Sequence, residues 1–266
     1  MKLIDTHTHL YDKAFDDDRD DVLRRASEAG VVKMMCPTID SQYHERLFNL
    51  CRDYPLRCFP MMGLHPTSVN DNPDWKSELQ IVEKYLAAPP VDKFYAIGEV
   101  GLDLYWSRDW QKQQEEVFER QVELSLTYSL PLVIHTREAW PQMTEILGKF
   151  AGKGLRGIMH SFSGTLDDYN TIRSFGEFMF GVGGPVTYKK SLLPDIVAAI
   201  PLSDIVLETD SPYLPPAPYR GKRNESSYVK YICEKVAEIK VLTPEEVAAV
   251  TTANAVKMFG LDDNDI

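Results

Sequence analysis

Near its amino terminus the chain carries a short apolar run that ends in two histidines, Lys2-Leu3-Ile4-Asp5-Thr6-His7-Thr8-His9, followed by an amphipathic stretch, Asp17–Ala29. A short continuous apolar run favours a buried strand, and charged residues at helical spacing favour a helix. The same alternation recurs along the chain. Counting Lys2–Thr6 as the first, the apolar runs continue with Val31–Pro37, Cys58–Gly63, Phe94–Gly98, Leu132–His135, Gly157–His160, Phe178–Val182 and Asp204–Glu208.

The stretches between these runs predict helices. They are Asp17–Ala29, Tyr43–Tyr54, Trp75–Leu86, Gln111–Tyr128, Trp140–Phe150 and Leu192–Ile200. The tail Ser226–Phe259 predicts two closing helices, the second capped by Thr243 with Pro244 at its first position. Eight apolar runs in 266 residues is about one per 30 residues, the size of one βα repeat. We therefore predict an α/β fold, a (β/α)8 TIM barrel formed by a single domain of residues 1–266, with a doubly wound open sheet as the competing architecture.

The charge and composition of the chain exclude several classes of protein. Twenty-nine basic and 40 acidic residues give a net charge of −11, which excludes a basic face that covers the whole molecule. The chain has neither a secretory signal pattern nor the ~20 apolar residues that span a bilayer. Its four cysteines form no CxxC pair. We expect reduced cysteines and a cytoplasmic protein without a membrane partner.

Five of the six histidines lie at or just past the carboxyl end of an expected strand: His7, His9, His65, His135 and His160. In a (β/α)8 barrel this end carries the active site. Because His7 and His9 are two residues apart on a strand, their side chains share one face and can bind one ion.

Two carboxylates complete a candidate metal site: Glu99 after the fourth apolar run and Asp210 after the eighth. Four imidazoles and two carboxylates exceed what one tetrahedral ion uses, so the pattern predicts two divalent ions with Glu99 as the shared ligand. Nitrogen and oxygen donors without a thiolate permit Mg²⁺, Mn²⁺, Zn²⁺, Ni²⁺ or Fe²⁺. Asp103 and Glu208 are candidates for carboxylates that orient the histidines.

Basic residues follow two of the expected strands. Arg137 comes two residues after His135, and Arg220 and Arg223 belong to the dense basic run of the chain, Tyr219-Arg220-Gly221-Lys222-Arg223-Asn224. Beside a metal site in an acidic protein, this run is interpreted as a rim that binds phosphate.

Together these segments resemble the TatD family of metal-dependent deoxyribonucleases, within the amidohydrolase-like barrels. The resemblance covers practically the whole chain. It is carried by the segments Asp5–Leu10, Gly63–Pro66, Ile97–Asp103, Gln114 to Gln121, Ile134–Ala139, His160–Gly164, Gly181–Gly184, Leu207–Leu214 and Arg220–Glu225. The chain departs from the family pattern at Ser226 and at Pro185, neither of which is a proposed ligand.

The resemblance implies a phosphodiester hydrolase, a deoxyribonuclease acting on single strands or strand ends of DNA. His7, His9, Glu99 and Asp210 would hold one metal, Glu99, His135 and His160 a second, and His65 would lie beside the scissile phosphate. In this mechanism the metals lower the pKa of a bound water, and Asp210 is the general base. The substrate-binding residues His65, Arg137, Arg220 and Arg223 would stabilise charge on the phosphate. Tyr11, Trp106 and Tyr213 are candidates for base stacking.

Three alternatives remain open at this point. The first is an amidohydrolase-type enzyme that cleaves an amide, lactone or ester with the same metals, since one barrel supports many chemistries. The second is hydrolysis of an aminoacyl ester on tRNA. The third is a non-catalytic binding module on an inactivated barrel, although no proposed ligand is missing. The oligomeric state is also left open.

Overall fold

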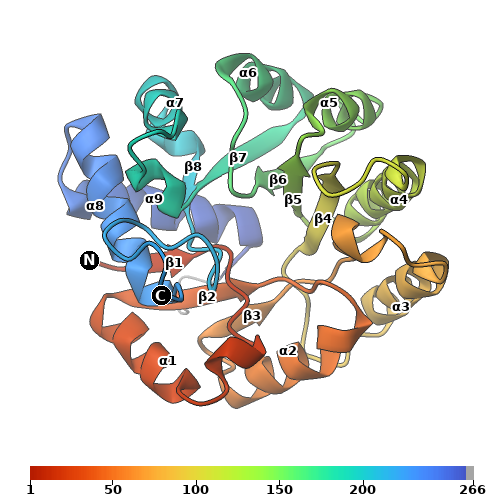
Figure 1. The fold of residues 1–266 in the computed structure, drawn as a ribbon, viewed down its shortest axis with the longest axis horizontal. Coiled ribbons are helices and arrows are strands. Elements are labelled where there is room, and N and C mark those ends of the chain that lie inside the picture. Colours follow the sequence, from red (N-terminus) through yellow and green to blue (C-terminus); the bar gives the residue numbers. More distant parts are fainter. Residues whose placement is uncertain (262–266) are drawn as a thin grey trace. The chain divides into compact units, whose positions relative to one another are not determined.

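The computed structural model describes residues 1–261, in which strands and helices alternate along the chain (Figure 1). In chain order these elements are β1 (Leu3–Asp5), α1 (Arg19–Glu28), β2 (Val31–Cys36), α2 (Ser41–Asp53), β3 (Cys58–Pro60), α3 (Trp75–Ala87), β4 (Ile97–Asp103), α4 (Gln111–Tyr128), β5 (Leu132–Arg137), α5 (Trp140–Gly148), β6 (Arg156–Met159), α6 (Leu166–Phe175), β7 (Glu177–Val182), α7 (Leu193–Ala199), β8 (Ile205–Leu207), α8 (Val229–Lys240) and α9 (Pro244–Phe259). Short 3-10 turns join several of them.

The described chain divides into two compact units. The first consists of Met1–Cys36, Leu50–Phe59 and residues 179–261, and the second of Pro37–Asn49 and Pro60–Phe178. The predicted single domain of residues 1–266 stays a prediction, and its last five residues lie outside the described part.

In the first unit, parallel strands carry the start and the end of the chain. Leu3 of β1 pairs with Val31 of β2, and Phe180 of β7 pairs with Ile205 of β8. The amide of Thr6 donates to the carbonyl of Leu207 at 3.0 Å, so the end of β1 lies beside the end of β8. Helix α9 packs on both of these strands and on α8. The polar residues that follow β1 and β8 are thereby brought to one edge.

In the second unit, β4, β5 and β6 are parallel neighbours. Ile97 pairs with Leu132, and Leu132 pairs with Gly157. All seven residues of β4 are buried, which is expected of a parallel strand covered on both faces. Helices α4 and α5 lie side by side outside β4 and β5 (Figure 1).

Most expected elements are confirmed within a few residues, and Gln111–Tyr128 matches α4 at both ends. The fourth strand differs, because β4 begins at Ile97 instead of Phe94 and continues to Asp103. Its second half contains charged and small residues, so the apolar run identified only its beginning. Helix α6 was not expected, because its sequence, Leu-Asp-Asp-Tyr-Asn-Thr-Ile-Arg-Ser-Phe, is short and mostly polar.

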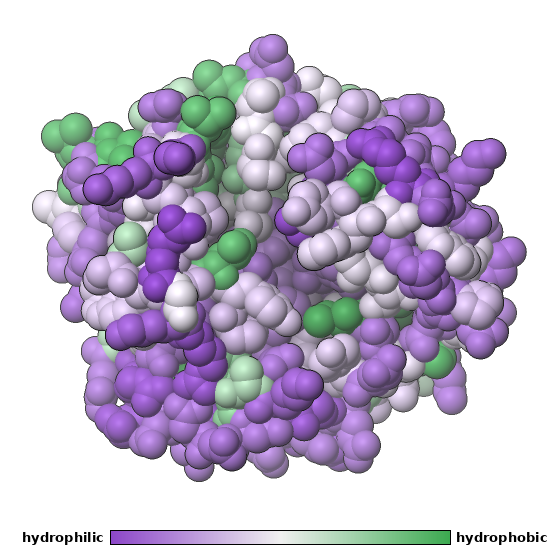
Figure 2. Space-filling view, viewed as in Figure 1, coloured by the Kyte–Doolittle hydropathy of each residue, from purple (hydrophilic) through white to green (hydrophobic). Residues whose placement is uncertain are grey.

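Hydrophilic residues cover most of the face seen in Figure 2, in keeping with the net charge of −11. Within residues 1–261, no helix has both the length and the apolar character that crossing a membrane requires. All four cysteines are buried and free of disulfides, as expected for reduced thiols.

Candidate functional site

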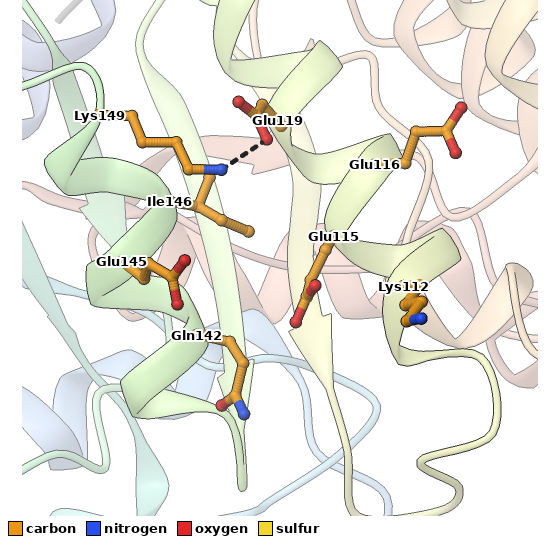
Figure 3. A pocket seen from close by; sticks show the side chains of 8 residues that line it. All are labelled: Lys112, Glu115, Glu116, Glu119, Gln142, Glu145, Ile146 and Lys149. Atoms are coloured by element: carbon orange, nitrogen blue, oxygen red, sulfur yellow. Dashed lines mark hydrogen bonds and ion pairs between the residues drawn. The ribbon is translucent and has the colours of Figure 1, made fainter.

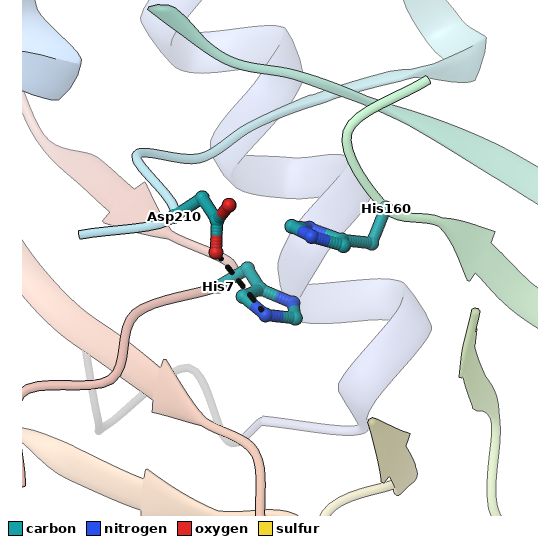
Figure 4. A group of neighbouring side chains, drawn as sticks. All are labelled: His7, His160 and Asp210. Carbon is teal, nitrogen blue, oxygen red and sulfur yellow. Dashed lines mark ion pairs between the residues drawn. The ribbon is translucent and has the colours of Figure 1, made fainter. Parts of the chain in front are cut away.

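The first unit brings His7, His9 and Asp210 together in a cluster. The Nε2 atoms of His7 and His9 are 3.3 Å apart. Asp210 Oδ1 lies 3.8 Å from His7 Nε2 and 3.4 Å from His9 Nε2. Figure 4 shows the carboxylate of Asp210 directed at the ring of His7. Three of the six predicted ligands therefore lie within reach of one ion in this unit.

The backbone of Asp210 positions its carboxylate in this first cluster. Asp210 has a φ of 58°, in the left-handed region, which aspartate tolerates better than most residues. Its amide donates to the carbonyl of His7 at 2.9 Å, and its own carbonyl accepts from the amide of Tyr213 at 2.8 Å. A non-glycine residue held in this region costs free energy, and such residues concentrate at functional sites.

The second unit assembles three imidazoles around Glu99. Glu99 Oε1 lies 3.3 Å from His65 Nε2, 3.2 Å from His135 Nδ1 and 3.7 Å from His160 Nε2. The side chain of Glu99 is almost fully buried. A buried carboxylate is costly without positive charge beside it, so this second cluster needs a metal ion or a protonated histidine.

A break in the register of β4 directs Glu99. Gly98 pairs with Val133 and Val100 with Ile134, so Glu99 is the extra residue of a bulge, a feature that re-aims a side chain. Gly101, two residues on, has a φ of +135°, and a Cβ there would lie 2.0 Å from the carbonyl oxygen of His135. Only glycine lets β4 approach β5 this closely. Glu99 was expected at the end of the fourth strand and lies near its beginning.

The spacing of donor atoms in both clusters fits a metal ion. Donors at about 2.0–2.1 Å from a tetrahedral ion lie about 3.3 Å from one another. The donor separations are 3.3, 3.4 and 3.8 Å in the first cluster, and in the second cluster Glu99 Oε1 lies 3.2 Å from His135 Nδ1 and 3.7 Å from His160 Nε2. Imidazole nitrogens and carboxylate oxygens suit divalent transition metals.

Asp103 orients His135, a role considered for it from the sequence. Asp103 Oδ2 accepts a 2.9 Å hydrogen bond from His135 Nε2, which leaves Nδ1 directed at Glu99. Burial lowers the pKa of His135, but the hydrogen bonds to Asp103 and Glu99 outweigh it and raise the pKa to about 9. Burial likewise opposes ionisation of Asp103, and the bond from His135 keeps its pKa below the usual value. A carboxylate behind a ligating histidine is the usual support of a metal site.

His65 is held in one tautomer by Thr67. The Nδ1 atom of His65 accepts from the amide of Thr67 at 3.2 Å and lies 2.7 Å from its hydroxyl oxygen. An Nδ1 that accepts a hydrogen bond leaves the proton of a neutral imidazole on Nε2. His65 Nε2 is then a donor directed at Glu99, which suits a group that contacts substrate better than a metal ligand.

Polar residues of the first unit that sequence reasoning had not singled out as site residues fix the first cluster. Buried Asp5 accepts from the amide of Thr209 at 2.9 Å and from its hydroxyl at 2.6 Å. Burial raises the pKa of Asp5 to about 7, against the hydrogen bonds that lower it. Buried Asn224 donates to the carbonyls of Thr209 and Tyr213 on either side of Asp210. The position of Asp5 and Asn224 near expected strand ends and proposed ligands was the signal available in the sequence, and it is not specific.

The three aromatic candidates differ in exposure. Tyr11 is buried, and its hydroxyl lies 2.8 Å from His9 Nδ1, so it supports His9 and offers no stacking surface. Tyr213 is half exposed, with its ring centroid 5.9 Å from that of His9. Trp106 is exposed and lies just beyond β4.

Two buried glutamines of α4 support the second cluster. Gln114 accepts from the amide of Asp103 at 2.9 Å and donates to its carbonyl at 3.0 Å. Gln121, two helical turns later, makes the same pair of bonds with Leu64, at 2.7 and 3.1 Å. The loop that carries His65 and the end of β4 are thus bonded to one face of one helix.

The arginines predicted for substrate binding differ in their exposure and in their ion pairs. Arg137 and Arg220 are exposed, and Arg220 lies over the ring of Tyr188 at 4.4 Å. Arg223 instead forms a bidentate ion pair with Asp18, with both distances 2.7 Å. This hydrogen bond from Arg223 keeps the pKa of Asp18 below its usual value. The guanidinium of Arg223 is therefore occupied by a structural partner.

Glu208, the other carboxylate considered for an orienting role, is fully buried on the face of Gly181. A Cβ at Gly181 would lie 2.3 Å from Glu208 Oε2, so this contact requires glycine.

A groove of about 280 Å³ lies between α4 and α5, and its lining differs from that of the two histidine clusters (Figure 3). It holds acidic side chains and two lysines, and Lys149 is paired with Glu119 at 3.0 Å. It contains no histidine, and its carboxylates lie on a solvated helix surface. Its lining residues are Lys112, Glu115, Glu116, Glu119, Gln142, Glu145, Ile146 and Lys149.

Comparison with known proteins places the chain among metal-dependent hydrolases. The family described as TatD related DNase matches residues 4–260. The uncharacterized metal-dependent hydrolase YabD of Bacillus subtilis is 36% identical over 265 residues, which cover 98% of this chain and 100% of YabD. The protein named 3′-5′ ssDNA/RNA exonuclease TatD of Erwinia tasmaniensis is 31% identical over 265 residues, covering 97% of this chain and 100% of that protein.

The crystal structure of YjjV, a TatD homologue from Escherichia coli, has a TM-score of 0.89 to this chain at 29% identity and covers 98% of both chains. The predicted fold class, an α/β protein with the TIM-barrel architecture, is thereby confirmed.

Proposed function

The chain belongs to the TatD related DNase family and is a metal-dependent hydrolase, and from this premise we propose that it hydrolyses phosphodiester bonds as a deoxyribonuclease acting on DNA ends. Support for the substrate class comes from the family description and from the relative named as an exonuclease of single-stranded DNA and RNA. The observation that carries the proposal is the pair of histidine–carboxylate clusters, whose donor spacings match a metal shell.

In this proposal His7, His9 and Asp210 bind one divalent ion, and Glu99, His135 and His160 bind another. The sequence resemblance further implies that Glu99 serves both ions. The donor set is compatible with Mg²⁺, Mn²⁺, Zn²⁺, Ni²⁺ and Fe²⁺. Bound metal supplies an acidified water and neutralises charge on the phosphate.

The protein's own residues then have separate tasks. Asp210 takes the proton of the attacking water, because its partly exposed carboxylate is beside both histidines of its cluster. His65 donates from Nε2 to a phosphate oxygen, since Thr67 occupies its other nitrogen. Glu99 is needed to hold metal.

Arg137 and Arg220 are proposed to bind the phosphates of the substrate, because both residues are exposed. Arg223 joins them only if its ion pair with Asp18 opens. With Arg223 occupied, few phosphates are neutralised, and this suits a strand end better than a long duplex. The free, buried cysteines are consistent with a cytoplasmic location, which we include in the proposal.

A substrate panel tests this proposal. The protein is stripped with a chelator, reloaded with each of the five metals, and offered a phosphodiester, a phosphomonoester, a carboxylic ester and a dihydroorotate-like amide. We expect metal-dependent turnover of the phosphodiester above all others. Preference for the carboxylic ester or the amide would replace the nuclease with the amidohydrolase-type reaction.

A further inference from the structure

Two aromatic side chains and an arginine form an exposed group beside the second cluster. Tyr105 is 53% exposed and Trp106 is 68% exposed. Their centroids are 5.0 Å apart, with an angle of 85° between the rings. The guanidinium carbon of Arg137 lies 3.7 Å from the Tyr105 centroid and 5.5 Å from that of Trp106. We call Tyr105, Trp106 and Arg137 the aromatic platform.

The platform is connected to the second cluster by hydrogen bonds. Asp103 accepts from the amide of Tyr105 at 3.1 Å with one carboxylate oxygen and from His135 at 2.9 Å with the other. The amide of Leu104 donates to the carbonyl of Arg137 at 2.9 Å, and Asp103 pairs with Arg137 in the sheet. The same carboxylate therefore fixes a proposed metal ligand and the start of the platform.

The arginine of the platform and a histidine of the second cluster leave the same strand close to each other. Arg137 follows His135 by two residues on β5, so both side chains leave the same face of the strand about 6.6 Å apart. A phosphate held at the cluster would place the base of a neighbouring nucleotide at the platform.

The chemistry of the platform matches the repeating unit of a nucleic acid strand. Arginine covers Tyr105, while Trp106 has most of its surface in water. An exposed indole and a phenol accept a nucleobase by stacking without sequence preference, and arginine adds attraction to the base and to its phosphate. A base in a duplex is already stacked and paired, so the platform selects unpaired bases.

We propose that the aromatic platform binds an unpaired nucleobase at the end of the strand being cleaved, and that it restricts this hydrolase to nucleic acids. The inference rests on the proposed phosphodiester activity and adds the recognition of the base. Small esters and amides lack the group that the platform would bind.

The test compares two single-stranded oligonucleotides of equal length, one with thymidine at both ends and one with abasic tetrahydrofuran residues there. We expect the wild-type protein, loaded with metal, to have a kcat/KM about tenfold higher for the thymidine ends, the factor expected for one base–aromatic stack. Trp106→Ala and Tyr105→Ala should reduce this ratio toward one, and Trp106→Phe should retain most of it.

Tyr128→Ala is the matched control, because Tyr128 is an exposed aromatic residue at the last position of α4. This variant should keep the wild-type ratio. A wild-type ratio near one, or an unchanged ratio in both alanine variants, would overturn the platform while leaving phosphodiester hydrolysis standing.

Binding separates the two proposals if neither oligonucleotide is cleaved. Stacking quenches tryptophan fluorescence, so the thymidine oligonucleotide should quench the wild-type protein more than the Trp106→Phe variant. Quenching without cleavage would contradict the nuclease proposal and support the platform. Equal quenching of both proteins would contradict the platform as well.

Discussion

At the residue scale, Asp210 combines a left-handed backbone with two imidazole neighbours. Asp210→Asn preserves the size of the side chain and one oxygen donor but removes the group that takes a proton. We expect the variant to fold and to bind most of its metal, with turnover lower by roughly 10²–10⁴, the contribution of a placed general base. Steady-state rates of the wild-type protein and the variant on a phosphodiester, compared at equal metal content, measure this loss. Near wild-type turnover would mean that Asp210 is not the base.

Glu99 and His65 touch each other, yet the account gives them different tasks. Glu99 Oε1 lies within 3.7 Å of three imidazole nitrogens, whereas the Nδ1 of His65 is engaged by Thr67 and its Nε2 carries a proton. Glu99→Ala should therefore lose more metal than His65→Ala. Metal analysis of the two purified variants measures this directly, and equal contents would show that His65 is a ligand too.

His44 is the histidine that lies away from both clusters, and it makes stability depend on pH. It is buried against the rings of Phe48 and Tyr85. Burial lowers the pKa of His44 below its usual 6.5, although Glu78 and Asp40 partly oppose this. Below pH 6.5 the unfolded chain binds a proton that the folded protein does not, so the free energy of unfolding falls as the pH falls toward the folded-state pKa.

The His44→Leu variant should lose that pH dependence, which amounts to at most about 1.4 kcal/mol per pH unit. Urea titrations of the wild-type protein and the variant between pH 5 and pH 8 compare the slopes. Parallel slopes in this range would show that His44 titrates alike in both states.

At the element scale, the start of α9 is a capping box that the sequence predicted in part. Thr243 accepts from the amide of Glu246 at 3.2 Å, and Glu246 accepts from the amide of Thr243 at 2.8 Å. Thr243→Ala removes the cap and should reduce the free energy of unfolding by about 1 kcal/mol. Thr243→Ser keeps the hydroxyl and should lose little. Chemical denaturation compares them, and identical midpoints would mean that this helix end does not limit stability.

The elements also show where sequence reasoning works and where it stops. Helix α4 was predicted at both ends because its apolar face is long and regular, whereas α6 has one buried residue and gave no pattern. The histidines at strand ends could be predicted because parallel strands bring their carboxyl ends to one edge. The bulge at Glu99 could not, because it depends on the pairing of β4 with β5. The ion pair of Arg223 could not be predicted either, because its partner Asp18 is 205 residues away along the chain.

At the scale of the whole molecule, an acidic protein can bind a polyanion only through a limited part of its surface. A net charge of −11 repels extended nucleic acid, so binding has to come from bound metal, exposed arginines and stacking. These features fit a strand end, of which only a few phosphates are neutralised.

The most direct test of the central claim is the digestion of 5′-labelled and 3′-labelled single-stranded DNA by the metal-loaded protein. The account predicts stepwise release of nucleotides from an end, abolished by a chelator, restored by a divalent metal, and lost in the Glu99→Ala variant. Cleavage that survives removal of the metal, or that is the same in Glu99→Ala, would contradict it.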